Sequence, residues 1–120
     1  MKYIELFAGC GGLSVGLESL NYEMVFANEL SPMAGETFAY NLLREDLRHL
    51  ADKKKSASKV KWISSQHKLN ELAERLRENP QNYPKFSSAT SELGEHLDDL
   101  YGKLIIGSIV ELNRYLTSHK

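Results

Sequence analysis

The feature that most narrows the possible folds of this chain is an apolar segment that runs straight into a cluster of glycines. Residues 3–7 read YIELF, and glycines follow at positions 9, 11 and 12. Beyond them, residues 13–20 carry leucines at helical spacing. A short apolar run bounded by glycines is typical of a buried strand, and the leucine spacing indicates a helix. The order of strand, glycine turn and helix predicts the opening unit of a parallel α/β sheet.

The same alternation continues after the first helix. Residues 23–28, EMVFAN, combine β-branched and aromatic residues and predict a second strand. Ser31 and Pro32 suit the N-cap and the first position of a helix, which the apolar spacing extends to about Leu50. A third strand is predicted in KLIIGS, at residues 103–108, and a helix follows it. The predicted fold class is therefore α/β, with three parallel strands that begin a partial Rossmann-like sheet.

The residues between the second and third predicted strands form a mostly helical insertion. The predicted division is 1–43 for the β-α-β-α unit, 44–102 for the insertion, and 103–120 for the third strand and its helix. Four segments are predicted inside the insertion: a lysine-rich loop or frayed helix end at 51–61, an amphipathic helix at 67–78, an irregular connection at 79–88 and a short helix at 93–100. The leucine stripe of the amphipathic helix indicates core packing, with a contact surface for a partner as the alternative.

The composition is that of one globular domain rather than of an isolated nucleic-acid binder. Hydrophobic residues make up 42% and charged residues 26%, and the net charge is -1. A single cysteine excludes an internal disulfide and fits a reducing, cytoplasmic setting. The chain shows no signal peptide and no apolar run near the roughly 18 residues that span a bilayer, so we expect no membrane partner. The four scattered histidines predict no metal site.

The glycine turn has the chemistry of an anion-binding site. A strand that feeds a helix through glycines presents free N–H groups and the positive end of the helix dipole. Ser14 stands where a dinucleotide fingerprint needs its third glycine, and no Lys-Ser or Lys-Thr pair follows, as a phosphate-binding P-loop requires. Glu29, after the second strand, suits a ribose diol. This combination predicts S-adenosylmethionine as the cofactor; a turn that binds nothing and a nicotinamide-binding domain are the alternatives.

Two segments resemble the N-terminus of the DNA (cytosine-5) methyltransferases. They are LFAGCGGLSVGLE at residues 6–18 and VFANELSPMAGETFAYN at residues 25–41. In that family the glycine motif and the Asn-Glu pair contact S-adenosylmethionine. A third segment, IIGSIVEL, resembles the family's Gly-Asp-Ile motif with a serine in place of the acid. The resemblance implies these cofactor-binding residues: Phe7, Ala8, Gly9, Cys10, Gly11, Gly12, Leu13, Asn28, Glu29, Leu30, Ser108 and Ile109.

The resemblance also implies chemistry that these 120 residues do not contain. The family attacks C6 of cytosine with a cysteine in a Pro-Cys motif, and none of the three prolines here precedes a cysteine. Cys10, in the glycine turn, is interpreted as a small filler and not as the nucleophile. The chain is therefore predicted to be the cofactor-binding N-terminal part of such an enzyme, with no catalytic residue of its own and inactive alone. DNA and a C-terminal methyltransferase half are the expected partners, and a non-catalytic interaction module is the alternative.

Overall fold

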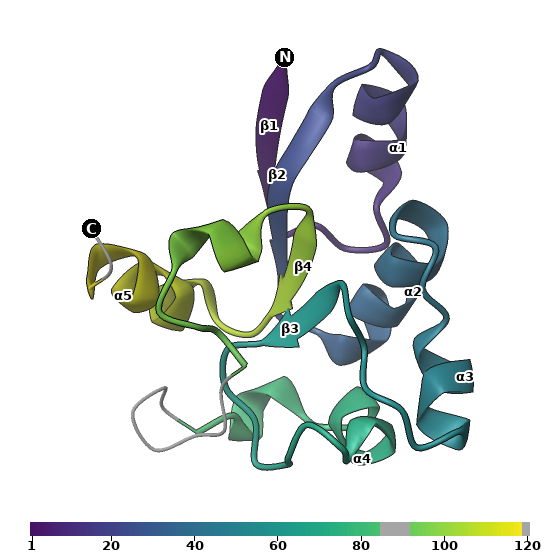
Figure 1. Cartoon of the computed structure of the whole chain (residues 1–120), viewed down its shortest axis with the longest axis vertical. Coiled ribbons are helices and arrows are strands. Elements are labelled where there is room, and N and C mark those ends of the chain that lie inside the picture. The colour runs from purple at the N-terminus through teal and green to yellow at the C-terminus, as the bar shows by residue number, and fades with distance from the viewer. Residues whose placement is uncertain (85–91, 119–120) are drawn as a thin grey trace.

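The computed structural model describes residues 1–84 and 92–118, which fold around a four-stranded parallel sheet (Figure 1). The strands are β1 (Lys2–Leu6), β2 (Glu23–Glu29), β3 (Val60–Trp62) and β4 (Lys103–Ile106), in the spatial order β1-β2-β4-β3. The α-helices are α1 (Gly12–Ser19), α2 (Pro32–Leu42), α3 (Leu47–Asp52), α4 (Leu72–Leu76) and α5 (Ile109–Ser118). Two short 3-10 helices, η1 (Pro80–Asn82) and η3 (Leu97–Leu100), complete the described elements. The predicted α/β class is confirmed.

Helices cover both faces of the sheet, so its central strands are apolar on both sides. On one face, Phe38 and Ala39 of α2 pack with Leu104 and Ile106 of β4. On the other face, residues of α5 pack against Phe26 of β2 and Ile105 of β4. Successive side chains of a strand point to opposite faces, so these two residues face away from α2. Figure 1 shows α2 and α5 on opposite sides of the strands.

The N-terminal β-α-β-α unit forms where its local sequence signals place it. Ser31 caps α2 through its side chain, which accepts a hydrogen bond from the N–H of Ala34, and Pro32 occupies the first turn. After α1, Asn21 takes a positive φ of 62° and turns the chain toward β2. Both features are local, and the Ser31-Pro32 start of α2 is as predicted.

The predicted extension of the second helix to Leu50 is wrong. The helix α2 ends at Leu42, and Arg44 adopts a positive φ of 54° that a helix cannot continue through. A separate helix, α3, then begins at Leu47 and is capped by Asp46, whose side chain accepts a hydrogen bond of 3.1 Å from the N–H of His49. A capping acid inside the leucine pattern therefore starts a new helix in a new direction.

The insertion differs from its prediction in that it contributes a strand. Val60–Trp62, which lies at the end of the predicted lysine-rich loop, pairs in parallel with β4, so the sheet has four strands instead of three. The predicted helix at 67–78 is reduced to α4, and Leu69 lies outside it, exposed. The predicted short helix near 93–100 is the 3-10 helix η3. The predicted irregular connection at 79–88 lies partly outside the described residues.

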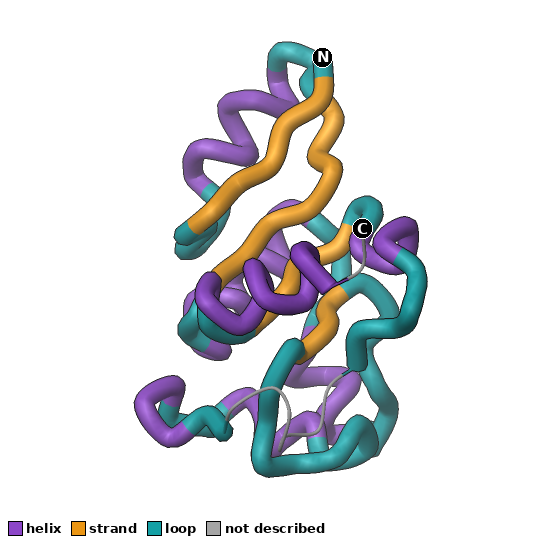
Figure 2. The backbone as a smooth tube through the Cα atoms, turned by 90° about the vertical axis from the view of Figure 1, so that its left-hand side faces the viewer, coloured by secondary structure: helices purple, strands orange, loops and turns teal. Residues whose placement is uncertain are grey.

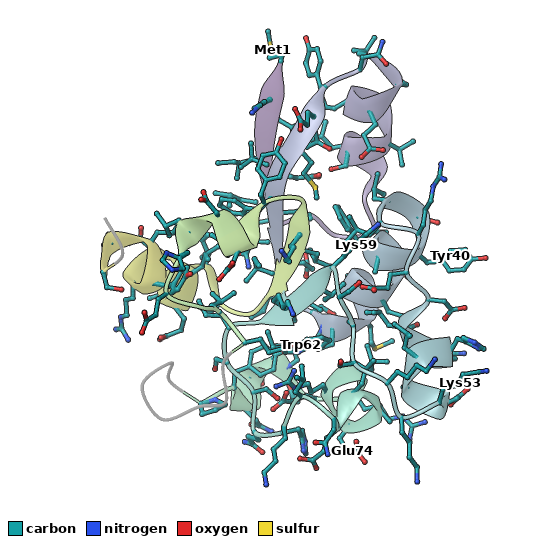
Figure 3. The ribbon with its side chains drawn as sticks, viewed as in Figure 1. Met1, Tyr40, Lys53, Lys59, Trp62 and Glu74 are labelled. Carbon is teal, nitrogen blue, oxygen red and sulfur yellow. The ribbon has the colours of Figure 1, made fainter. Side chains whose placement is uncertain are left out.

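Side chains of the insertion hold β3 in place at the edge of the sheet. Trp62 is fully buried between β3 and α4 (Figure 3), and the guanidinium of Arg75 lies 5.3 Å from the centre of its ring. Arg75 is itself buried; it forms an ion pair with Glu92 and donates two hydrogen bonds to the carbonyl of His67. The carboxylate of Glu92 balances the charge of the buried guanidinium, and the carbonyl of His67 accepts two of its donors. Arg75 can therefore lie in the core.

Candidate functional site

The residues singled out from the sequence meet at one edge of the sheet. Because β1, β2 and β4 are parallel, their carboxyl ends lie side by side, and the segments that follow them are neighbours. The N–H of Ala8 donates to the carbonyl of Asn28 at 2.9 Å, and the N–H of Gly107 donates to the carbonyl of Glu29 at 3.0 Å. These two hydrogen bonds join the three segments into one continuous rim.

Glu29 connects the glycine turn to the start of α2. Its Oε1 accepts a hydrogen bond of 2.8 Å from the N–H of Gly9, and its Oε2 accepts one of 2.8 Å from the N–H of Ser31. The carboxylate therefore faces the glycine turn. Each carboxylate oxygen has a second lone pair, so two further donors, such as the hydroxyls of a diol, could still be accepted.

The three glycines of the turn differ in what surrounds them. A Cβ on Gly11 would lie 2.4 Å from Leu42 Cδ2, and the φ of Gly11 is +94°, so this glycine is required by backbone conformation and by close packing on α2. A Cβ on Gly9 or on Gly12 would meet nothing within 4 Å. The open side of the turn is therefore at Gly9 and Gly12, where another molecule could approach the backbone.

Asn28 is a buried structural residue of the rim. Its side-chain amide donates hydrogen bonds to the carbonyls of Ile105, at 2.9 Å, and Gly107, at 3.1 Å. These bonds bind the end of β2 to the end of β4. The structure brings Asn28 to the rim, as predicted, and both of these hydrogen bonds of its amide go to the protein itself.

The remaining candidate residues divide into exposed and inward-facing ones. Ser108 and Ile109 are half-buried at the start of α5, where Ser108 Oγ accepts a hydrogen bond of 3.2 Å from the N–H of Val110. Ala8 is buried. Four others are exposed to solvent: Phe7, Cys10, Leu13 and Leu30. The rim therefore presents apolar surface beside the open glycines, which suits contact with another apolar group.

Sequence reasoning did not anticipate the role of Ser14. Its side chain is buried and donates a hydrogen bond to the carboxylate of Glu5, which is also buried, on β1. A glycine at this position would leave that carboxylate without this donor in the core. The alternation of β1, which places Glu5 on the face toward α1, was the signal that could have revealed the pair.

Tyr83 is a second residue that the sequence did not single out. Its hydroxyl and the indole N–H of Trp62 are buried and make no hydrogen bond among the described residues. Burial raises the pKa of the Tyr83 phenol well above its usual value, and the nearby carboxylates of Glu78 and, more weakly, Glu29 add to the shift.

A cavity of about 780 Å³ lies beside the rim, between α2, α3 and α4. Ser31, Pro32 and Met33 line its near side, and Arg77 and Glu78 line its far side. The glycine turn does not take part in it.

In residues 1–84 and 92–118, no cluster of histidine, cysteine or acidic side chains is placed to hold a metal ion. None of the helices in these ranges is both long enough and apolar enough to cross a membrane.

The site is an open glycine turn joined to an acid at the carboxyl edge of a parallel sheet, which is where open α/β sheets generally bind their ligands. A sequence model of the C-5 cytosine-specific DNA methylases matches residues 1–69, more than half of the chain. The chain belongs to this family, which confirms the resemblance read from the sequence. No solved structure matches the chain.

Three curated methyltransferases are similar to part of this chain. The type II methyltransferase M.NgoPII of Neisseria gonorrhoeae is 39% identical over 57 residues, which cover 43% of this chain and 17% of the relative. M.FnuDI of Fusobacterium nucleatum is 37% identical over 54 residues, 42% of this chain and 16% of the relative. M.DdeI of Desulfomicrobium norvegicum is 37% identical over 70 residues, 52% of this chain and 17% of the relative. The match thus spans about one sixth of each relative's length.

Proposed function

We propose that this chain is the S-adenosylmethionine-binding N-terminal part of a DNA (cytosine-5) methyltransferase. The observation that carries the proposal is Glu29, whose carboxylate lies against the N–H of Gly9 and is held there by a second bond from Ser31. An acid in this position can receive the hydroxyls of a ribose while the amino-acid end of the same ligand lies on the turn. The family match over residues 1–69 includes every one of these groups.

The surroundings of the turn fit such a cofactor. The sides of Gly9 and Gly12 that would carry a Cβ are open, which gives a carboxylate access to the N-terminus of α1. Leu30 is exposed next to Glu29 and would supply an apolar surface for the adenine, with Ile109 at the start of α5, after the neighbouring strand β4. Gly11, in contrast, faces α2, so we assign it to the shape of the turn rather than to the ligand.

The chain's own residues bind and orient in this proposal; they do not attack the base. The cofactor supplies the methyl group when it is bound. The sequence has no Pro-Cys pair, and its only cysteine, Cys10, is exposed in the turn at the cofactor's carboxylate end. The thiolate that attacks cytosine and the residues that read DNA would therefore come from other polypeptide, and we expect these 120 residues alone to transfer no methyl group.

The test is a calorimetric titration of the chain with S-adenosylmethionine, using a matched pair of glycine variants. Gly12 and Gly16 both lie in α1, and a side chain on either would meet nothing within 4 Å. We expect Gly12→Leu to weaken binding at least tenfold because its side chain would occupy the ligand's approach, and Gly16→Leu to bind as the parent chain does. Equal affinities for the two variants, or no binding by the parent at millimolar cofactor, would contradict the proposal.

A second function is supported by the exposed apolar residues around the same rim. Phe7, Leu13 and Leu30 could contact a protein rather than a nucleoside, in a non-catalytic interaction module. The same titration separates the two functions, because a pure interaction module would give no heat with S-adenosylmethionine and no difference between the Gly12 and Gly16 variants.

A further inference from the structure

Positive charge is gathered in one stretch of the chain, between the end of α2 and β3. Residues 44–61 contain seven lysines and arginines against three acids, a net charge of +4, whereas the rest of the sequence carries a net charge of -5. A whole-chain charge near zero therefore hides a strong local asymmetry. An asymmetry of this kind indicates a surface that attracts an anionic partner.

Three consecutive lysines carry the part of this charge that the protein does not use itself. Arg48, Lys59 and Lys61 each have a partner, which is an acid for Arg48 and Lys61 and the carbonyl of Leu43 for Lys59. The lysines at positions 53–55, here called the lysine turn, are exposed. None of the three forms an ion pair with an acid in the part of the chain that the structure describes. Their ammonium groups are therefore available to another molecule.

The backbone of the lysine turn is fixed by the end of α3. The N–H of Lys54 donates to the carbonyl of Ala51 at 3.0 Å, and the N–H of Lys55 donates to the carbonyl of Leu50 at 2.9 Å. These two hydrogen bonds form a Schellman motif, in which the residue after the C-cap is usually glycine. Here that residue is Lys54, with a φ of 55° that strains a side chain. A lysine at this position costs stability that a glycine would not, which favours a function for the side chain.

The lysine turn lies on the same side of the sheet as α2. Leu47 of α3 belongs to the same buried cluster as Phe38 of α2, whereas Figure 2 shows α5 lying across the other face. Figure 3 shows Lys53 at the outer margin of the fold, beside α3. The cavity between α2, α3 and α4 is lined by Asp52, the residue before the turn, and by Ser31 at the rim. A molecule held at the lysine turn would therefore be separated from the rim by the width of this cavity.

A partner with closely spaced phosphates suits three adjacent lysines. Each ammonium is a compact charge on a flexible stem, which binds a phosphate without demanding a fixed geometry. Duplex DNA carries one negative charge for about every 1.7 Å of its axis, so the side chains of a single turn can reach neighbouring phosphates. The sequence model of the C-5 cytosine-specific DNA methylases matches residues 1–69, and these include the turn. Among polyanions, duplex DNA is therefore the one that this chain is expected to meet.

We propose that the lysine turn binds the phosphate backbone of duplex DNA without reading its sequence. The three ammonium groups would displace counterions from the duplex, and the acidic remainder of the chain would steer the duplex toward this turn. The contact would hold DNA beside the rim while other polypeptide reads the bases. The choice of DNA rests on the proposed function, whereas the unpaired charge and the strained Lys54 are properties of this chain alone.

The test is fluorescence anisotropy of labelled DNA duplexes of two unrelated sequences, titrated with the full chain at several salt concentrations and without cofactor. Replacing all three lysines of the turn with glutamine should weaken binding about tenfold or more, equally for both sequences. The slope of log affinity against log salt should fall by about 0.9 for each lysine. The matched control combines Lys2→Gln, Lys68→Gln and Arg114→Gln, which removes the same charge from exposed positions elsewhere. It should bind nearly as the parent chain does.

A single substitution separates binding from folding. Lys54→Gly relieves the side-chain strain at a φ of 55°, so the urea midpoint of unfolding should rise. The same variant removes one phosphate contact, so its affinity for DNA at low salt should fall about fivefold. A chain that is more stable and yet binds DNA less tightly cannot owe the loss to misfolding.

Three results would overturn the proposal. One is the absence of DNA binding by the parent chain at low salt. Another is an equal loss of affinity in the lysine-turn variant and in the matched control, which would show that only the net charge matters. The third is tighter binding to vesicles of anionic lipid than to DNA, which would assign the turn to a membrane surface. Titration with S-adenosylmethionine reports on the proposed function separately, and its failure would leave these DNA measurements unchanged.

Discussion

Replacing Glu29 with glutamine tests whether this side chain holds the rim together. The carboxylate accepts one hydrogen bond from Gly9 and one from Ser31, each 2.8 Å long. A glutamine has the same shape but only one acceptor oxygen, and its NH₂ group would face a backbone N–H that also donates. One of the two backbone N–H groups would therefore lose its partner, and the other would lose the benefit of a charged acceptor.

The expected cost follows from these two losses. A hydrogen bond to a charged group contributes about 1.5–3 kcal/mol, and an unpaired buried donor costs about 1–3 kcal/mol. Because the site is only half-buried, water can compensate in part, and we expect Glu29→Gln to lower the free energy of unfolding by about 2 kcal/mol. For a domain of this size that corresponds to a fall of roughly 6–8 °C in melting temperature.

Urea unfolding followed by far-UV circular dichroism measures this cost, with Glu36→Gln as the control. The carboxylate of Glu36 lies 3.6 Å from the exposed guanidinium of Arg48, a pair of the kind that contributes less than about 1 kcal/mol. We expect the urea midpoint to fall clearly for Glu29→Gln and hardly at all for Glu36→Gln, with similar slopes. If the two variants unfolded at the same urea concentration, the assignment of Glu29 as the clamp between the turn and α2 would be refuted.

The remaining predictions concern packing, a buried ion pair and pH. Gly11→Ala should cost about 2–4 kcal/mol in urea unfolding, because its Cβ would overlap α2 at a positive φ, whereas Gly16→Ala should add about 0.5–1 kcal/mol; equal effects would contradict the packing role. Arg75→Met should cost about 3 kcal/mol, because the buried Glu92 would keep only Lys61, 3.9 Å away, as a cationic partner, and Arg75→Met combined with Glu92→Leu should recover part of that loss in the same assay. The raised pKa of Tyr83 means that the unfolded state releases this proton first as pH rises, so its contribution to stability is complete below pH 10 and is lost above it. In urea titrations from pH 9 to 11, Tyr83→Phe should lose less stability than the parent chain.

The strands and the rim were predictable because their signals are local. The apolar run before the glycines, the segment at 23–28 and the Ser31-Pro32 pair each specify their element within a few residues. Once three parallel strands are placed, their carboxyl ends must meet at one edge, so the neighbourhood of Glu29 and the glycine turn follows from topology. The separate functions of Gly11 and Gly12 do not follow, because only the packing of α2 distinguishes them.

The strand β3 was not predictable, since what stabilises it is distant in the sequence. Its three residues sit in a polar, lysine-rich stretch, and their periodicity is too short to be recognised. The groups that fix it are Glu45 and Glu92, which approach from opposite directions along the chain, and Arg75 beneath Trp62. The end of α2 was missed for a related reason, because the leucine spacing continues through Asp46 although the helix does not.

The two acids that bind the backbone just before β3 and at its end have a consequence for assembly. A sheet with two receptive edges can add molecules without limit and grow into a fibre, whereas a sheet with one occupied edge stops after a single addition. Glu45 already holds the N–H groups of Ser58 and Lys59, and Glu92 holds that of Trp62, so these donors are not free to pair with a strand of another molecule.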